Sequence, residues 1–274
     1  MAIITISRGT FSGGALLAED LAKRLGYKCL SRELILDSAK EFGVPEYKLM
    51  EAIQKGPSAF QRFTHERQRY LALYQATLCE HVASDNVVYH GHAGHFLLKC
   101  VPHVLRVRII APMEFRINQL MERQKMDRDD AIKHINKVDK QRIKWTKFLY
   151  GDDWTSPSLY DMVFNLENLS IPFISEIIQH AVQHDRFKTT PAAKKALDDL
   201  LLSSRVRAAI VLNPLCRNSE FTVSANSGIV TVGGKLRSQE ETDEIIATAS
   251  RTSGVTKVIN EMVLDYRYQQ EVDI

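Results

Sequence analysis

The chain has 274 residues, of which 45% are hydrophobic and 25% are charged. These fractions are those of a folded globular protein and exclude a disordered chain. The formal net charge of +3 is too small to argue for nucleic acid as a partner, and we expect none. No apolar run approaches the roughly 18 residues that a membrane span needs. The four cysteines lie far apart with no CxxC pair, so we expect reduced thiols in a cytoplasmic protein.

Short β-branched strands alternate with longer helical segments from the N-terminus to about residue 184. Strands are predicted over residues 2–7, 86–91, 104–110 and 160–166. The first helix, GALLAEDLAKRLG, carries its leucines on one face and ends at Gly26. Two further helices are predicted over residues 113–124 and 127–150. This alternation is typical of an α/β fold with a parallel sheet.

A polar stretch that ends in a proline, HDRFKTTP at residues 184–191, separates this region from one with a different rhythm. We predict a first domain over residues 1–184, a linker over 185–191 and a second domain over 192–268. The second domain has a helix, then two alternating strands around the turn at 226–228, then a helix and a closing strand. Ser238 is the expected N-cap of that second helix, with Glu241 as its capping-box partner. The order α-β-β-α-β predicts a small α+β domain with an antiparallel sheet.

The segment SRGTFSGGA, residues 7–15, joins the first strand to the first helix. A glycine-containing turn at this position binds phosphate through backbone amides and the positive end of the helix dipole. The pattern GxxxxGK[ST] is not satisfied. Arg8 stands at its first glycine, Gly14 at its lysine and Ala15 at the residue whose hydroxyl would bind magnesium. On the pattern alone, a phosphate loop and an ordinary strand-to-helix turn both stay open.

Further motifs follow in order along the first domain. They are ITISRGTFSGG from residue 3, SREL at 31–34, GHAG at 91–94, APMEFRI at 111–117 with MER at 121–123, DKQR at 139–142, YGDDW at 150–154 and YDMVFN at 160–165. Taken together, over residues 2–183, the chain resembles the cytidylate-kinase-like family, a branch of the nucleoside monophosphate kinases on the P-loop fold. A glycine in place of the loop lysine is a trait of that branch.

The resemblance implies a P-loop kinase-like parallel sheet with flanking helices and a helical lid. It also implies a phosphotransferase that uses ATP and Mg²⁺ and binds nucleotide. The sites it implies are Arg8, Arg123 and Arg142 for catalysis, Ser12, Gly13, Gly14 and Ala15 for the cofactor, and Arg32, His92 and Asp139 for the substrate. Arg8 would supply the charge of the missing lysine, and Asp139 would orient Arg142 or a metal-bound water. Cytidylate is the family's label, and no residue favours it over another phosphate acceptor.

The lid residues have a second interpretation, because charged helix residues are usually exposed and pair with neighbouring carboxylates. Arg116, Arg123 and Arg142 would then be solvated helix faces. The histidines of HGHAGH, residues 90–95, have no carboxylate or cysteine beside them, so we expect no metal site there. The three large aromatic residues of this region are expected in the core rather than against a base: Trp145, Trp154 and Tyr160.

Four departures from the family's pattern bear on turnover. Phe11 replaces a glycine, Ser31 an aspartate and His92 an arginine, and Ala15 replaces a polar or basic residue. Each loss would weaken transition-state stabilisation. A catalytically degenerate nucleotide sensor without turnover is therefore the alternative to an active kinase.

The second domain has its own pattern of glycine and valine, in residues 223–234 and again in residues 254–260. This spacing resembles a BON domain. Such domains are associated with binding, so the resemblance implies a small-molecule, lipid or protein ligand and no catalytic residue. A packing and oligomerisation module is the other interpretation, and a homo-oligomer stays open.

Overall fold

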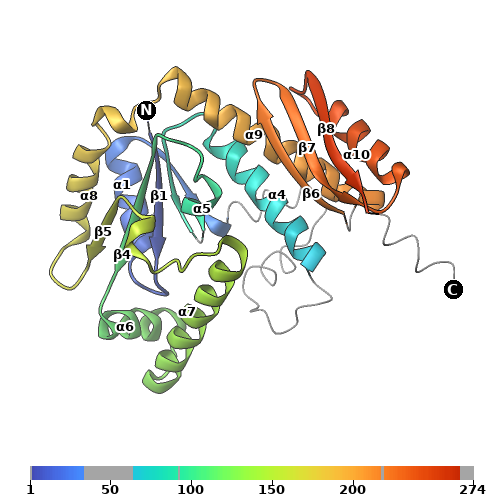
Figure 1. Ribbon diagram of the computed structural model, residues 1–274. Coiled ribbons are helices and arrows are strands. Elements are labelled where there is room, and N and C mark those ends of the chain that lie inside the picture. The colour runs from blue at the N-terminus through green and yellow to red at the C-terminus, as the bar shows by residue number, and fades with distance from the viewer. Residues whose placement is uncertain (1, 34–63, 92, 217–218, 266–274) are drawn as a thin grey trace. The chain divides into compact units, whose positions relative to one another are not determined.

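The computed structural model describes residues 2–33, 64–91, 93–216 and 219–265 (Figure 1). The chain divides into two compact units. Of the described residues, the N-terminal unit holds 2–33 and 84–190, and the C-terminal unit holds 64–83 and 191–265. Within these residues, none of the helices has the length and the apolar character that a bilayer span requires.

A five-stranded parallel sheet forms the centre of the N-terminal unit, in the order β2-β3-β1-β4-β5 (Figure 1). Its strands are β1 (Ile3–Arg8), β2 (Lys28–Ser31), β3 (Val87–His90), β4 (Val104–Ile110) and β5 (Met162–Asn165). β1 is buried along nearly its whole length because both faces of a parallel sheet are covered. The prediction of a parallel sheet is confirmed. β2 was not among the predicted strands, since its four residues KCLS carry no alternating pattern.

Helices flank this sheet. They are α1 (Gly14–Leu25), α5 (Gly94–Leu97), α6 (Met113–Gln124), α7 (Arg128–Tyr150) and α8 (Ile171–Ala181), with 3-10 turns at Pro157–Leu159 and Asp185–Phe187. α1 and α8 share one core with the sheet, in which Leu21, Val107 and Ile178 are fully buried. α1 ends at Gly26, whose φ of 66° is the left-handed conformation predicted for that stop.

α6 and α7 form the helical lid. Figure 1 shows the two helices side by side beyond the ends of the strands. They have a small core of their own, made by Ile117, Leu120, Ala131 and Ile135. α7 begins after Asp127, whose carboxylate accepts a hydrogen bond from the amide of Asp130 at 2.9 Å. The lid that the family resemblance implied is therefore present.

The C-terminal unit combines helices and a second sheet. Its elements are α4 (Thr64–Val82), α9 (Pro191–Leu212), a 3-10 turn (Pro214–Cys216), β6 (Glu220–Asn226), β7 (Ile229–Leu236), α10 (Gln239–Arg251) and β8 (Lys257–Leu264). The strand order is β6-β7-β8. α9 and α10 cover the same face of the sheet, because Val206, Val232 and Ile245 meet in one core.

This second sheet is mixed, so the prediction of an antiparallel sheet was wrong for β8. β6 and β7 are antiparallel and joined by a tight turn in which Ser227 and Gly228 have φ values of 51° and 85°. Positive φ at both central residues is the requirement of the tightest hairpin turns. β8 lies parallel to β7, because α10 carries the chain back across the sheet before β8 begins.

α4 packs along α9 in the C-terminal unit. Arg205 on α9 forms a two-pronged ion pair with Glu80 on α4, with Nη2 to Oε2 at 2.6 Å. One residue earlier on each helix, the Cys79 sulfur lies 3.8 Å from the Ser204 hydroxyl, and burial raises the pKa of that thiol to about 12. In sequence α4 lies between β2 and β3, so the order along the chain does not predict this pairing. The domain boundaries at residues 184 and 192 stay a prediction.

Ser238 caps α10 and gives the first test. Its hydroxyl accepts a hydrogen bond from the amide of Glu241 at 3.1 Å, as the capping pattern predicts. Replacing such a cap by alanine costs about 1 kcal/mol. We expect Ser238→Ala to speed hydrogen–deuterium exchange in the first turn of α10 about fivefold. Ser250→Ala in the same helix is the control, because that hydroxyl only bonds back to the Ile246 carbonyl. Equal exchange in Ser238→Ala and the wild type would contradict the cap.

Candidate functional site

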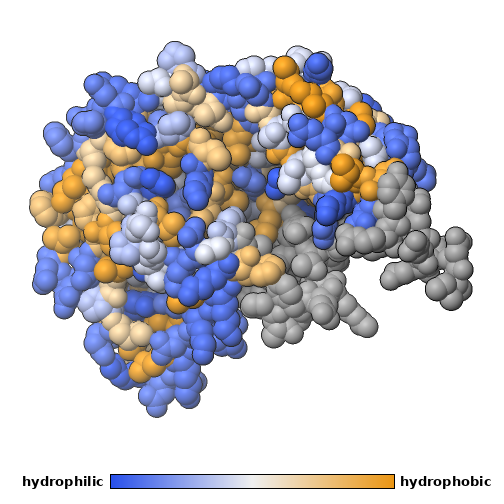
Figure 2. Space-filling view, viewed as in Figure 1, coloured by the Kyte–Doolittle hydropathy of each residue, from blue (hydrophilic) through white to orange (hydrophobic). Residues whose placement is uncertain are grey.

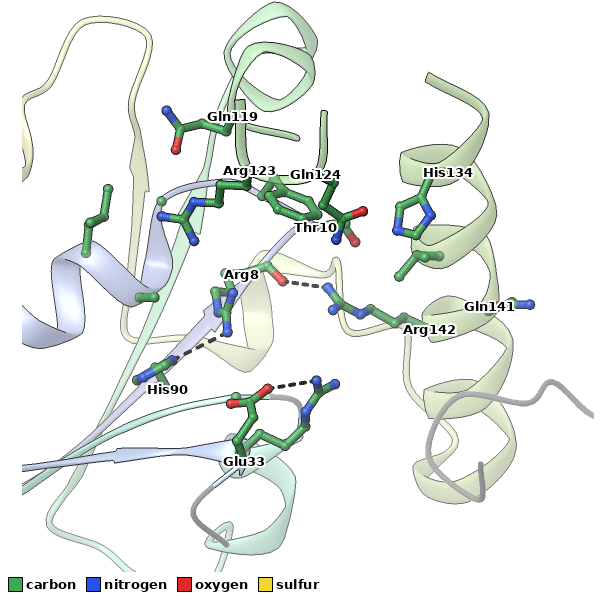
Figure 3. Close-up of a pocket in the computed structure, with 17 residues that line it drawn as sticks. Arg8, Thr10, Glu33, His90, Gln119, Arg123, Gln124, His134, Gln141 and Arg142 are labelled. Carbon is green, nitrogen blue, oxygen red and sulfur yellow. Dashed lines mark hydrogen bonds and ion pairs between the residues drawn. The ribbon is translucent and has the colours of Figure 1, made fainter. Parts of the chain in front are cut away.

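A cavity of about 590 Å³ lies at the carboxyl edge of the N-terminal unit's sheet (Figure 3). Its walls come from the ends of β1 and β3, the residues after β2, the first turn of α1 and the two lid helices. Open parallel sheets bind their ligands at this edge. Four arginines from four separate places line it: Arg8, Arg32, Arg123 and Arg142.

Arg8 and Gly14 occupy one space. Arg8 is the last residue of β1, and its side chain passes over the start of α1. A β-carbon on Gly14 would lie 2.3 Å from Cδ and 2.8 Å from Cβ of Arg8. Carbon atoms do not approach so closely, so any side chain at position 14 would displace Arg8. Arg8 in this conformation and a lysine at position 14 therefore exclude each other.

The surroundings of Arg8 hold its guanidinium at the cavity. Its Nη2 lies 3.4 Å from Nδ1 of His90 (Figure 3). Burial, and then the charge of Arg8, lowers the pKa of His90 to about 4, so the ring is neutral at pH 7 and accepts from Arg8. Burial also lowers the pKa of Arg8, which Glu33 partly offsets. Nε of Arg8 is buried and has no hydrogen-bond partner among the described atoms.

The start of α1 offers backbone amides to the cavity. Gly13 caps the helix in the left-handed conformation, with φ of 78°, and the amide of Leu17 donates to its carbonyl at 3.1 Å. The amides of the first turn before Leu17 have no acceptor within the helix. That turn carries no acidic side chain, so nothing on the helix offsets its positive end. Gly13 and Ala15 both line the cavity.

Two other loop residues have structural contacts. The Ser12 hydroxyl is buried and donates to the Gly9 carbonyl at 3.0 Å, so it closes the loop on itself rather than lining the cavity. Phe11 lines the cavity and also packs against the core of the lid. The φ of Phe11 is 57°, which lies in the left-handed region. A glycine, which the family resemblance implies at this position, adopts that conformation without strain.

Asp139 on α7 joins the lid to the loop. Its carboxylate accepts from the Thr10 hydroxyl at 2.8 Å, from the Thr10 amide at 3.2 Å and from Nη2 of Arg116 at 2.5 Å. Nε of Arg116 in turn donates to the Thr10 carbonyl at 2.7 Å. Within the described part of the chain, Asp139 thus makes hydrogen bonds with Thr10 and Arg116. It makes none with Arg142, the residue that it was expected to orient. Asp139 itself does not line the cavity.

Two further lid arginines, Arg142 and Arg123, face inward. Nη1 of Arg142 donates to the Arg8 carbonyl at 3.2 Å (Figure 3). Burial lowers the pKa of Arg142 to about 10; the charge of Asp139 partly offsets this effect, and the cations of Arg8 and Arg32 add to it. Arg142 therefore stays charged at pH 7. Arg123, at the end of α6, points into the cavity (Figure 3). It makes no ion pair or hydrogen bond with another residue that the structure describes.

Arg32 and Glu33 follow β2 directly. Nη2 of Arg32 donates to Oε1 of Glu33 at 2.9 Å. Burial raises the pKa of Glu33, but the charge of Arg32 and the hydrogen bonds of the carboxylate together outweigh it and hold that pKa below its ordinary value. Glu33 is the one carboxylate among the described residues of the lining. The cavity therefore carries an excess of positive charge and suits an anion.

The lining also holds residues that sequence analysis did not assign to the site: Leu16, His90, Gln119, Gln124, His134 and Gln141. Gln119 lies four residues before Arg123, and His134 lies eight before Arg142, so helical spacing from the arginines would have found them. His92, a predicted substrate-binding residue, lies outside the described residues. His95 is buried, with Nε2 3.4 Å from the Tyr160 hydroxyl. The three aromatic residues expected in the core, Trp145, Trp154 and Tyr160, are buried.

Comparison with known proteins identifies a family for each of the two parts of the chain. The sequence model of the cytidylate kinase-like family matches residues 3–168, and that of the BON domain matches residues 198–266. The chain is 26% identical over 183 residues to a cytidylate kinase of Ignicoccus hospitalis, covering 65% of this chain and 98% of that protein. It is also 26% identical over 183 residues to a cytidylate kinase of Thermococcus kodakarensis, covering 66% and 88%.

Among solved structures, an uncharacterised protein from Eubacterium ventriosum aligns with a TM-score of 0.52 and 21% identity, covering 66% of this chain and 98% of that one. At this identity the likeness concerns the fold alone. The family match spans more than half of the chain and includes the loop, the residues after β2 and the lid arginines. This chain therefore belongs to the cytidylate kinase-like family, and it carries a BON domain after the kinase-like part.

Proposed function

We propose that this chain is a phosphotransferase that binds ATP in the cavity and transfers its terminal phosphoryl group to a nucleoside monophosphate or a similar phosphate acceptor. One observation carries the proposal. Four arginines from separate elements line one cavity together with the start of α1, and Glu33 is the one carboxylate among the described residues of that lining. Phosphoryl transfer requires positioning and positive charge around the transferred group, and this arrangement supplies both.

Each group of residues around the cavity would have its own role, set by its position. The amides from Gly13 to Leu16 would hold phosphate oxygens at the positive end of α1. Arg8 would supply the charge that a loop lysine supplies in other phosphate loops, since it occupies the space above Gly14. Arg123 and Arg142 would reach the transferred group from the lid, and Arg32 would hold the acceptor. Asp139 would act as a positioning residue, because its hydrogen bonds fix the loop against the lid.

The cavity fits phosphates well and offers little to a metal. Ala15 has no hydroxyl, and Glu33 is held by Arg32 at 2.9 Å. Within the described residues no three His, Cys, Asp or Glu side chains gather as metal ligands. Mg²⁺ commonly binds through nucleotide phosphates and water with few protein ligands, and when bound it neutralises part of the phosphate charge. We therefore expect it to enter with ATP rather than to a site of its own.

A second function is favoured by this shortage of metal ligands. A nucleotide sensor that binds ATP without transferring phosphate would use the same arginines and amides and would need no residue to position a metal. The BON domain would then report the occupied cavity through a small-molecule, lipid or protein ligand of its own. The two functions share the binding step and differ in turnover.

A phosphoryl-transfer assay separates them. We expect the purified protein to convert ATP and at least one nucleoside monophosphate to the two diphosphates, because the charges that stabilise the transferred group are present. Arg123→Ala should lower kcat by about 100-fold, since its guanidinium is free to meet a phosphate. Arg128→Ala is the control, because that lid arginine pairs with Glu114 on the surface. ATP binding without any transfer would favour the sensor, and absence of binding would contradict both functions.

The role of Arg8 is tested by calorimetric titration with ATP and Mg²⁺. We expect Arg8→Ala to weaken ATP binding at least tenfold, about 1.4 kcal/mol, because a buried cation next to phosphate is lost. Arg24→Ala serves as the matched control, since this arginine lies at the other end of α1 and pairs with Asp20. An unchanged affinity in Arg8→Ala would remove Arg8 from the site.

The exclusion between Arg8 and position 14 has a separate consequence. Gly14→Ala should weaken ATP binding about as much as Arg8→Ala, because the new β-carbon pushes Arg8 from the cavity. Alanine favours helix over glycine, so α1 itself is not weakened. In an Arg8→Ala background, calorimetry should find that Gly14→Ala has little further effect. Additive losses in the double variant would show that position 14 acts independently of Arg8.

A further inference from the structure

The outer edge of β8 is an open sheet edge. In the strand order β6-β7-β8, β8 pairs with β7 on one side, and no described strand lies on its other side. The amide of Asp265 donates to Leu236 on β7, whereas the amide of Met262 is bonded to the side chain of Asn260 at 2.9 Å. The backbone of Val258, Asn260 and Met262 therefore faces the open edge, because alternate residues of a strand point to opposite sides. An exposed edge of this kind is a template for another strand.

The outward face of β8 has a defined pattern of side chains. Val258 and Met262 pack against the core of the C-terminal unit, so the odd-numbered side chains lie on the opposite face. These are Lys257, Ile259, Glu261 and Val263, with Ile259 37% and Val263 57% exposed. Figure 2 shows apolar groups at the surface of this unit, interrupted by polar ones. Neither Lys257 nor Glu261 forms an ion pair with any described residue.

This pattern is complementary to itself. If a second β8 runs antiparallel with Ile259 opposite Ile259, then Lys257 of each strand stands opposite Glu261 of the other. Both odd-numbered faces stay on one side of the sheet, and Ile259 meets its own copy. In the same arrangement Val258 and Asn260 face each other with their backbone groups directed across the gap. Opposite charges directly across two strands stabilise the pair.

Neighbouring registers are less favourable. Centring the pair on Glu261 sets two carboxylates opposite each other, which is destabilising. Centring it on Asn260 sets Ile259 against Glu261 and Lys257 against Val263, so neither the charges nor the apolar groups match. A register shifted by one residue would place the odd-numbered side chains of one strand against the core face of the other. The sequence of β8 thus selects one arrangement, centred on Ile259.

We propose that the edge of β8 binds a second copy of this chain, giving a two-fold dimer with a continuous six-stranded sheet. The occupant is the same chain because the complement of Lys257-x-Ile259-x-Glu261 in an antiparallel strand is that sequence itself. A two-fold interface of this kind closes at two copies and leaves no further edge of β8 exposed. The dimer uses only the C-terminal unit and does not depend on the proposed activity of the cavity.

Charge reversal tests the register directly. In sedimentation experiments on the full chain, we expect a concentration-dependent dimer, and Lys257→Glu and Glu261→Lys should each weaken it at least tenfold. Each single change sets two like-charged pairs across the strands, while the double variant restores both attractive pairs and should return to within about threefold of the wild type. Lys99→Glu, at an exposed position of the N-terminal unit, changes the net charge by the same amount as Lys257→Glu and should leave the dimer intact.

A second readout locates the contact. Exchange of the Val258 and Asn260 amides should slow as the protein concentration rises, because these groups become hydrogen-bonded across the two-fold axis. The proposal is overturned by a wild type that stays monomeric at about 300 µM, by single reversals that leave dimerisation unchanged, or by a double variant that is no better than the singles. A dimer without concentration-dependent protection of β8 would also overturn it, since its contact would lie elsewhere.

Discussion

The space above Gly14 holds one side chain, and Arg8 fills it. Much of the cavity depends on this constraint. Arg8 reaches the cavity from the end of β1. There the neutral ring of His90 accepts a hydrogen bond from the Arg8 guanidinium, and Arg142 donates one to the Arg8 carbonyl. A side chain at position 14 would displace the Arg8 side chain and with it the contact to His90. The loop departs from the common phosphate-loop pattern at Arg8 and at Gly14, and these two departures depend on each other. The strand supplies the cation as Arg8, and the helix therefore begins with a glycine.

A cluster of arginines is costly to assemble before an anion arrives. Arg8 and Arg142 are buried enough that their pKa values fall, and the charge of Arg8 lowers the pKa of Arg142 further. The loop and lid are nevertheless held together by contacts other than those among these arginines. Asp139 joins Thr10 to Arg116, while Phe11 packs into the lid core. Stability comes from this outer set of contacts, and an arriving phosphate would relieve the repulsion within the inner one.

The C-terminal unit contains a helix that comes from within the kinase-like part of the sequence. α4, encoded between β2 and β3, packs on α9 through the Glu80–Arg205 pair and the Cys79–Ser204 contact. A chain that ended at the predicted boundary would leave α4 without this helix. On its other side the unit presents the edge of β8, whose charge pattern is self-complementary. A helix from the kinase-like part of the sequence thus packs within the C-terminal unit.

The sequence by itself determined the local elements. Helical spacing with Gly26 and Ser238 at the ends fixed α1 and α10, and β-branched runs fixed β1, β3 and β4, because these patterns depend on neighbouring residues. The arginines and the loop were also recognisable as candidates. Only the tertiary structure decided that Arg8 and Gly14 exclude each other, that Asp139 binds Thr10 and Arg116, that β8 is parallel to β7 and that α4 joins α9. Asp139 and Thr10 are 129 residues apart, and no local periodicity records a contact between groups so distant in the chain. Such contacts follow from how the elements pack, and packing is decided by the whole fold.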